Sequence, residues 1–167
     1  MSDRAKLELE IARLAEEIAQ LFVSRQLTLA VAESCTGGLI AHSLTNVPGS
    51  SRFFLAGLCV YGVEAKVNVL GVPRELIQRH SVVSPEVAKR MAERVMQLCG
   101  SDVGLGTTGL AGPATGTEKL EVGTVFIATA TKTATVAHRF HYHSDRVGTK
   151  LSAAIDALCL IRYAVLK

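Results

Sequence analysis

At residues 27–38 the chain reads LTLAVAESCTGG. The apolar run over 27–32 predicts a short buried strand, and residues 33–38 predict a turn that leads into a helix over about 37–46. The turn places a hydroxyl and a thiol, those of Ser34 and Cys35, where a strand ends and a helix begins. The first N–H groups of a helix lack partners inside the helix, so at that position they can donate hydrogen bonds to another group.

The rest of the sequence alternates helical and strand patterns around this unit. Apolar residues recur at helical spacing over about 3–25, which predicts an amphipathic helix. Further elements are expected as strands over 54–61, 102–108, 122–131 and 133–141, the last two forming a hairpin, and as helices over 64–70, 73–80, 84–98 and 145–165. Helices at both ends and between strands predict an α/β fold, a three-layer α/β/α sandwich with a mixed sheet.

The composition predicts one cytoplasmic domain over residues 1–167. The 167 residues are 49% apolar and 20% charged, which fits a single globular domain. The formal net charge of +3 comes from scattered residues, so we expect no nucleic-acid partner. The apolar runs end well before the ~20 residues that span a membrane. The four cysteines form no CxxC pair and the N-terminus has no signal-peptide pattern, so we expect free, mostly buried thiols in a reducing compartment.

The turn over 33–38 has two interpretations. In the functional one, helix N–H groups stabilise an oxyanion or a phosphate, and Gly37 and Gly38 let a ligand approach the backbone. In the structural one, Ser34 or Thr36 only caps the helix and the glycines only serve a tight turn. Spacing alone leaves both open.

A serine nucleophile needs a base, and neither GxSxG nor SxxK surrounds Ser34. The segment after the second strand offers the phenol of Tyr61 and the amine of Lys66. If Lys66 is desolvated beside the turn, its pKa falls and the neutral amine can accept the serine proton. The alternative is that both side chains are solvated at the surface.

Residues 104–109, GLGTTG, match the GxGxxG pattern of dinucleotide-binding domains. That motif opens a helix, whereas residues 111–116 continue here as an irregular loop, so we do not expect a Rossmann domain. We expect instead a strand whose carboxyl end delivers Thr108, Gly109 and a glycine-rich loop to a ligand crevice.

Three further features have a functional and a structural interpretation each. Arg146 near the start of the last helix either binds an anion or simply faces solvent. His141 and His143 share a face of a strand, but no neighbouring ligand completes a set, so we expect no metal. Cys35 rivals Ser34 as nucleophile, yet no histidine lies in the neighbouring motifs to activate it.

Taken together, the motifs resemble the CinA C-terminal domain family over nearly the whole chain. The resemblance rests on AESCTGG (32–38), PGSS (48–51), YGVEAK (61–66), LGV (70–72), VS (83–84), TGLAGP (108–113), VGTV (122–125) and DR (145–146). It implies the stand-alone form of the domain, because the family's other domain has no counterpart in this sequence. Characterised members are nicotinamide-nucleotide amidohydrolases, also called PncC or NMN deamidases.

The resemblance implies hydrolysis of the carboxamide of nicotinamide mononucleotide to nicotinate mononucleotide and ammonia, without a cofactor. Carried over by motif, Ser34 would be the nucleophile, Lys66 and Tyr61 would handle its proton, and Thr108 would lie beside them. Backbone donors would come from the turn Thr36, Gly37 and Gly38, and the substrate would also meet Gly109 and Arg146.

The sequence departs from the family pattern at Val63, Leu120, Glu121 and Lys150. Two alternatives to the amidase therefore stand beside it: a member that binds a pyridine nucleotide or another phosphorylated ligand without turnover, and a regulatory or interaction domain. The apolar faces of the terminal helices leave a homo-oligomer open as well.

Overall fold

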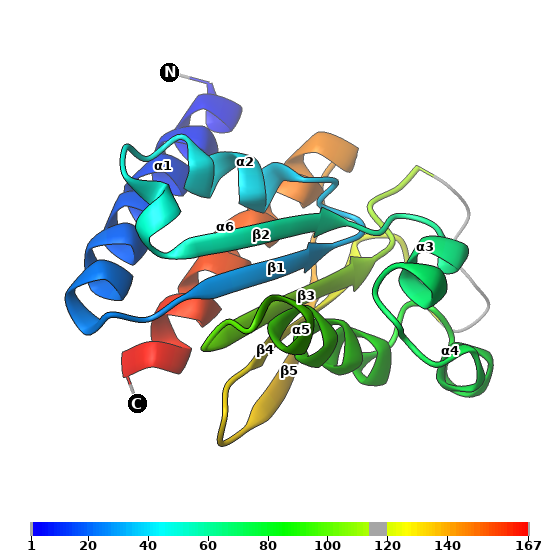
Figure 1. The fold of residues 1–167 in the computed structure, drawn as a ribbon. Helices are drawn as coiled ribbons and strands as arrows, with labels where there is room; N and C mark the ends of the chain where they lie inside the picture. The colour runs from blue at the N-terminus through cyan, green and yellow to red at the C-terminus, as the bar shows by residue number, and fades with distance from the viewer. Residues whose placement is uncertain (1, 114–119, 167) are drawn as a thin grey trace.

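The computed structural model describes residues 2–113 and 120–166. They form a five-stranded sheet with helices on both faces (Figure 1). The strands are β1 Leu29–Glu33, β2 Phe54–Cys59, β3 Val103–Gly109, β4 Thr124–Ala130 and β5 Thr135–His141. The helices are α1 Asp3–Arg25, α2 Leu39–Thr45, the short 3-10 helix η1 Ser50–Arg52, α3 Val63–Asn68, α4 Arg74–His80, α5 Pro85–Cys99 and α6 Arg146–Leu166.

The strand order is β2-β1-β3-β4-β5. β1 lies between β2 and β3 and runs parallel to both, whereas β4 and β5 follow β3 in antiparallel pairs, so the sheet is mixed. Because the three parallel strands end at the same edge, the residues that follow β1 and β2 meet those at the end of β3. This topology brings three distant segments of the chain to one crevice.

The sheet separates two layers of helices, as Figure 1 shows. α1, α2 and α6 pack on one face and α5 on the other. Every residue of β1 is buried, and its side chains alternate: Leu29 and Val31 join the core on the α1 and α6 side, while Ala30 and Ala32 join the core on the α5 side. Small side chains on the α5 side let that helix lie close to the sheet.

The α/β sandwich with a mixed sheet is confirmed, and every expected helix and strand is present within about three residues of its predicted ends. η1 is an addition, since residues 48–51 were expected only to end the preceding helix. The glycines of the GxGxxG pattern have a packing role: a Cβ on Gly104 or Gly106 would lie 2.1 or 2.4 Å from a carbonyl oxygen of α5. Among the described helices, none is both long and apolar enough to cross a membrane.

Candidate active site

Ser34 directly follows β1, at the centre of the parallel part of the sheet. Its backbone N–H donates to the carbonyl of Thr107 on the neighbouring strand β3, with a distance of 3.1 Å. The residue is largely buried, with 7% of its surface exposed. A strand end fixed by its neighbour therefore holds the serine hydroxyl in one place.

The amine of Lys66 contacts the Ser34 hydroxyl directly. Lys66 lies on the short helix α3 and is fully buried, and its Nζ is 2.8 Å from Ser34 Oγ. Nζ also donates to the backbone carbonyls of Val60 and Tyr61, at 2.8 and 2.9 Å. Three oxygens thus surround the amine, and one of them is the expected nucleophile.

Burial lowers the pKa of Lys66 to about 8 from its ordinary value of 10.5, because the charged form loses its hydration. A neutral amine has two N–H groups and one lone pair. When the carbonyls of Val60 and Tyr61 take the two N–H groups, the lone pair is left for the hydroxyl of Ser34. The geometry suits a general base at slightly alkaline pH.

Glu33 caps the start of α2 with its side chain. Its carboxylate is 1% exposed and accepts the backbone N–H groups of Gly38, Ile40 and Ala41 at 3.1, 3.1 and 2.8 Å. A buried charge is stable there because three donors and the positive end of the helix face it. Glu33 therefore ties the turn that carries Ser34 to the following helix.

This cap corrects part of the sequence prediction. The N–H of Gly38 is bonded to Glu33, and the N–H of Gly37 donates to the carbonyl of Ser34 at 3.0 Å, so neither is available to a substrate. The prediction of substrate donors at these two glycines is wrong, because the turn satisfies them internally. Their role is conformational, since both have positive φ angles, 63° and 92°.

Thr36 turns its side chain away from the crevice. The residue is fully buried, and its hydroxyl is 3.0 Å from the hydroxyl of Thr107. In the described part of the chain, the backbone N–H groups of Cys35 and Thr36 have no oxygen acceptor and face the Cys35 sulfur. These two N–H groups are the donors that the turn can still offer.

The phenol of Tyr61 does not contact the serine. Its hydroxyl accepts a hydrogen bond from the Arg146 guanidinium at 2.7 Å, and the ring is largely exposed. Only the backbone carbonyl of Tyr61 meets Lys66 and Ser34, at 2.9 and 3.4 Å. Arg146 thus holds the phenol away from the serine in this structure, and its expected role in the proton relay stays a prediction.

A cavity of about 370 Å³ opens in front of Ser34. Ser34, Lys66, Tyr61, Thr108, Gly109 and Arg146 all line it, together with Cys35, Gly62, Val63, Val82, Val83, Leu110, Ala111 and Gly112. Its volume is in the range of small-molecule sites. Most of the lining is apolar, and of the described residues around it only Lys66 and Arg146 carry ionisable basic groups.

Thr108 and Gly109 lie at the end of β3, and both line this cavity. The Thr108 hydroxyl donates to the Val82 carbonyl at 2.8 Å, which fixes the loop before α5 against the sheet. A Cβ on Gly109 would lie 2.8 Å from the Thr124 carbonyl oxygen, so only glycine lets β4 approach here. Of the loop predicted over 111–116, residues 114–116 lie outside the described residues.

Cys35 is poorly suited to be the nucleophile. The thiol is buried, and burial raises its pKa to about 12. At neutral pH such a thiol is protonated and unreactive. The hydroxyl that shares a hydrogen bond with Lys66 is the better nucleophile.

His141 is the last residue of β5, and His143 lies beyond the strand. The rings of His141 and His143 meet edge to face with centroids 4.6 Å apart, and His141 Nε2 is 3.5 Å from a carboxylate oxygen of Glu121. Within residues 2–113 and 120–166, no three His, Cys, Asp or Glu side chains are grouped to hold a metal ion.

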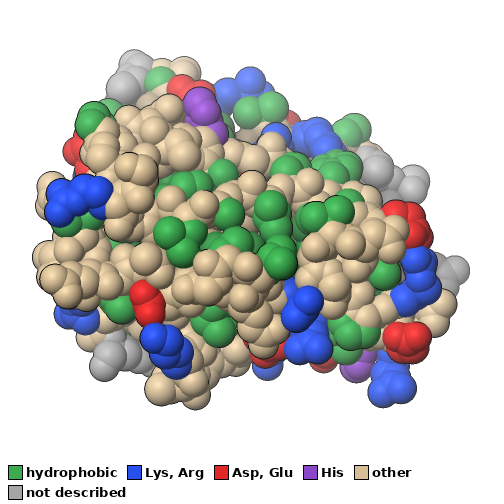
Figure 2. All heavy atoms as spheres, in the orientation of Figure 1, with side chains coloured by type: hydrophobic (Ala, Val, Ile, Leu, Met, Phe, Trp, Pro, Cys, Tyr) green, Lys and Arg blue, Asp and Glu red, His purple; other side chains and the backbone are tan. Residues whose placement is uncertain are grey.

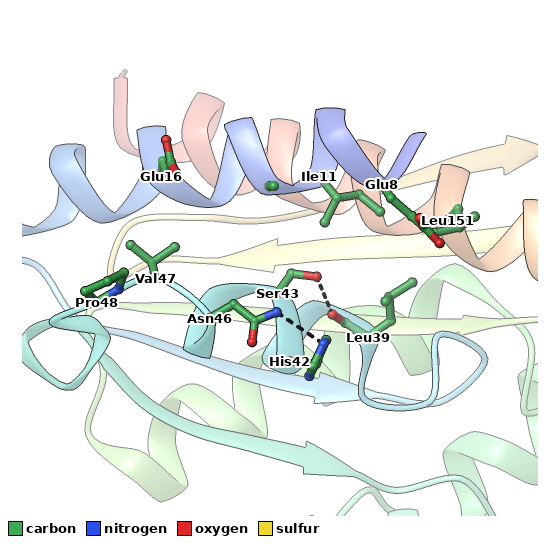
Figure 3. A pocket seen from close by; sticks show the side chains of 11 residues that line it. Glu8, Ile11, Glu16, Leu39, His42, Ser43, Asn46, Val47, Pro48 and Leu151 are labelled. Carbon is green, nitrogen blue, oxygen red and sulfur yellow. Dashed lines mark hydrogen bonds between the residues drawn. The ribbon is translucent and has the colours of Figure 1, made fainter. Parts of the chain in front are cut away.

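A second hollow of about 290 Å³ lies between α1 and α2 (Figure 3). Its polar groups on α2 bond within that helix: the Ser43 hydroxyl donates to the Leu39 carbonyl at 2.7 Å, and the Asn46 amide is 3.1 Å from His42 Nε2. Glu8 and Glu16 of α1 flank an apolar floor. With no nucleophile paired to a base, this hollow offers no catalytic constellation.

Sequence reasoning missed two residues of the site, Glu33 and Thr107. Both lie in segments that drew attention for other reasons, the serine turn and the GxGxxG pattern. A carboxylate placed just before a glycine-rich turn and a helix was an available signal for the cap. Thr107 had no such signal, because its contact with Thr36 depends on the pairing of β1 and β3.

Comparison with known proteins identifies the family. The model of the CinA C-terminal domain matches residues 11–165. The chain belongs to this family. A CinA-like protein of Desulfotalea psychrophila is 43% identical over 154 residues, covering 92% of this chain and 37% of that protein. A CinA-like protein of Geobacter metallireducens is 44% identical over 149 residues, covering 89% of this chain and 36% of that protein. The chain thus spans a little over a third of these curated relatives.

Solved structures agree with this family. The crystal structure of the competence/damage inducible protein CihA from Agrobacterium tumefaciens matches with a TM-score of 0.90 at 32% identity, covering 95% of this chain and 96% of that one. A CinA superfamily protein from Klebsiella pneumoniae matches with a TM-score of 0.90 at 28% identity, covering 93% and 98%. The chain has the fold of the CinA superfamily, and these names state no reaction.

Proposed function

We propose that this chain is a serine amidase that hydrolyses the carboxamide of nicotinamide mononucleotide to nicotinate mononucleotide and ammonia. The proposal rests above all on one observation, the 2.8 Å contact between Lys66 Nζ and Ser34 Oγ in a buried site with a lowered lysine pKa. The substrate is the one that the family resemblance implies. The reaction type follows from the pair itself, because a serine beside a neutral amine is suited to acyl transfer.

In the acylation step, Lys66 takes the proton of Ser34 and Oγ attacks the carboxamide carbon. The resulting oxyanion accepts the N–H groups of Cys35 and Thr36, which are unbonded to oxygen in the described residues. The Lys66 ammonium then protonates the amide nitrogen. The bond between the carboxamide carbon and its nitrogen breaks, ammonia leaves, and the mononucleotide remains as an acyl ester on Ser34 Oγ.

In the second step, the neutral amine of Lys66 takes a proton from water, and the hydroxide attacks the ester carbonyl. The bond between the acyl carbon and Ser34 Oγ breaks, and Lys66 returns the proton to the serine. The acid product ionises to a carboxylate and the released ammonia takes up its proton, so the two steps together convert the amide and one water into a carboxylate and an ammonium ion. No other reactant is required.

Arg146 is the group that we assign to the nucleotide. Its guanidinium lies at the cavity, held by the carbonyl of Gly112 and the hydroxyl of Tyr61. A guanidinium pairs well with a phosphate. The helix α2 offers no anion site, since Glu33 occupies its first N–H groups.

The test is an assay of ammonia release with identification of nicotinate mononucleotide by mass spectrometry. The native chain is expected to form both products. Ser34→Ala is expected to abolish them, and Cys35→Ala, which alters the neighbouring residue only, is expected to retain activity. Full activity of Ser34→Ala would remove the serine from the mechanism.

A second candidate function is binding of a pyridine nucleotide without turnover. Val63 supports it: this valine lines the cavity at the start of α3, where the resemblance would place an asparagine. Calorimetry with nicotinamide mononucleotide distinguishes the two functions. Heat of binding without product formation would favour the binding protein over the amidase.

A further inference from the structure

Ser81 has a strained backbone. This residue follows α4, and its φ and ψ angles are 72° and 154°. That region is adopted almost only by glycine, because the Cβ of any other residue is crowded there. Gln26 is the other non-glycine residue with positive φ in the described chain, and it has the ordinary left-handed conformation at the end of α1. Strain of this kind persists only where the surrounding structure holds it, and it gathers at functional sites.

Hydrogen bonds and packing hold the segment that follows Ser81. The Val82 carbonyl accepts from the Thr108 hydroxyl at 2.8 Å, and the Ser81 carbonyl accepts from the Ser84 hydroxyl at 2.9 Å. The Val83 side chain is buried in the apolar core on the α5 side of the sheet. The strained conformation is thus imposed from both sides, by the end of α4 before it and by these contacts after it.

These contacts place Val82 close to the strand that adjoins the nucleophile. The Ser34 N–H donates to the Thr107 carbonyl at 3.1 Å, and Thr108 is the next residue of β3. One further hydrogen bond joins Thr108 to Val82. Val82 and Val83 both line the cavity in front of Ser34, and together we call them the valine wall. The strain at Ser81 therefore lies directly beside a surface of the candidate active site.

The valine wall is apolar and stiff. Both residues are β-branched, so each side chain has few rotamers. Residues 81–84, SVVS, carry no charge, whereas charged side chains gather over the neighbouring helices α3 and α4, at the right in Figure 2. A flat ring gains by leaving water and contacts many atoms of such a surface at once. The wall therefore suits an aromatic part of a substrate.

We propose that the valine wall is the contact surface for an aromatic ring that carries the reacting amide, and that Ser81 is the positioning residue of this wall. The inference deepens the proposed function and rests on it: the site selects amides of aromatic acids over aliphatic amides. For attack, the carboxamide carbon must come within about 3–3.5 Å of Ser34 Oγ. A ring that lies flat on a fixed wall brings its carboxamide to one place, so the wall sets this distance.

Methyl NMR of the valine side chains tests the ring contact without any turnover. Nicotinamide is expected to shift the methyl resonances of Val82 through its ring current. Propionamide, which has the amide without the ring, is expected to leave them in place. The spectrum of Val82→Ala assigns these resonances by their absence. Val82 methyls that stay unmoved throughout a nicotinamide titration, or that move equally with both amides, would overturn the proposal.

Kinetics separate a contact with the ring from support of the serine. Val82→Ala is expected to lower kcat/KM for nicotinamide mononucleotide about tenfold, because apolar contacts with the substrate are lost. The rate at which an alkyl fluorophosphonate labels Ser34 is expected to stay within about twofold of native, because this reagent has no ring. Val23→Ala on α1, also a half-buried valine, is the matched control and is expected to be native in both assays. An equal loss in both assays, or a native kcat/KM in Val82→Ala, would overturn the proposal.

Three variants test the role of Ser81. Ser81→Gly relieves the strain and is expected to melt a few degrees above Ser81→Ala, which keeps it. Ser81→Val adds a β-branched side chain, which this conformation tolerates least, and is expected to raise KM for nicotinamide mononucleotide several-fold while the labelling rate of Ser34 stays native. A glycine variant that melts no higher than the alanine variant would disprove the strain. A native KM in a folded Ser81→Val would disprove the positioning role.

Failure of the proposed function gives a different result from failure of this inference. If the chain releases no ammonia from nicotinamide mononucleotide, yet its Val82 methyls shift with nicotinamide and not with propionamide, the amidase is lost and the ring contact stands as a binding site. If the chain releases ammonia without that shift, the amidase stands and the role of the valine wall is overturned.

Discussion

Lys66 Nζ lies 2.8 Å from Ser34 Oγ, although 32 positions separate the two residues in the sequence. The serine follows β1 and the lysine lies on α3, which follows β2. The contact therefore depends on the parallel pairing of these two strands. Within this frame, a buried amine and a hydroxyl form a unit whose behaviour can be tested by pH and by substitution.

The first prediction concerns the pH profile of the amidase. Since the pKa of Lys66 is about 8, roughly a tenth of the amines are neutral at pH 7 and most are neutral at pH 9. We expect kcat/KM to rise about tenfold per pH unit below 8 and to level off above it. Initial rates of ammonia release between pH 6 and 9 measure this rise in kcat/KM. A profile that is flat between pH 6 and 9 would contradict a lysine base.

The second prediction concerns stability. The native pKa of Lys66 lies below its ordinary value, so the unfolded chain binds more protons between about 8 and 10.5 and stability rises with pH in that window. Lys66→Met lacks this titration. Relative to that variant, we expect native stability to gain about 2 kcal/mol between pH 7 and 10. Urea unfolding at both pH values measures the difference, and a difference that stays constant would show that folding does not lower the pKa of Lys66.

The third prediction concerns the cap of α2. Glu33→Gln replaces one carboxylate oxygen by an NH₂ group that faces backbone N–H donors, so we expect a loss of about 1–3 kcal/mol in stability. The turn with Ser34 would move, and kcat is expected to fall at least tenfold with a smaller change in KM. Glu16→Gln on the exposed face of α1 is the control. Native kcat in Glu33→Gln would show that the cap does not position the serine.

The fourth prediction separates the two contacts of Tyr61. Tyr61→Phe keeps the backbone carbonyl that meets Lys66 and removes only the hydroxyl that meets Arg146. We expect KM to rise several-fold, because Arg146 loses its support, and kcat to remain within about twofold of native. Steady-state kinetics of Tyr61→Phe and of the native chain measure both constants. A fall in kcat as large as that of Lys66→Met would return the phenol to the proton relay.

The fifth prediction concerns the packing of α5. A Cβ on Gly106 would lie 2.4 Å from the Ala88 carbonyl oxygen, so Gly106→Ala forces the helix away from the sheet. We expect a loss of roughly 1–3 kcal/mol in stability. Gly62→Ala is the control, since no atom lies within 4 Å of the added Cβ there. Equal thermal stability of the two variants would contradict close packing at β3.

The order of elements could be predicted from sequence, because periodicity and turn residues act locally. The strand over 27–32 and the capped helix from Ser84 follow from such signals, and the structure has both. The strand order β2-β1-β3 could not be derived in this way, because it depends on contacts between distant segments. The pairing of Ser34 with Lys66 was therefore expected from the family resemblance and from the needs of a serine nucleophile.

The details of the site were harder to predict than its location. Which way Tyr61 turns depends on Arg146, 85 positions away, and no local pattern encodes that contact. Gly37 and Gly38 were correctly placed in the turn, but their N–H groups are bonded inside it to Ser34 and Glu33. A sequence shows which donors exist, whereas their availability depends on every neighbour in the folded chain.

The register of β1 against β2 decides whether a folded molecule has a reactive Ser34. A slip of one residue between them would displace Lys66 from Ser34 by about 3.3 Å, far beyond the range of a hydrogen bond. Misregistered molecules would keep their helices and much of their compactness yet lack a reactive hydroxyl. The fraction of molecules whose Ser34 is labelled by an acylating reagent would thus equal the fraction in which β1 and β2 are paired in the correct register.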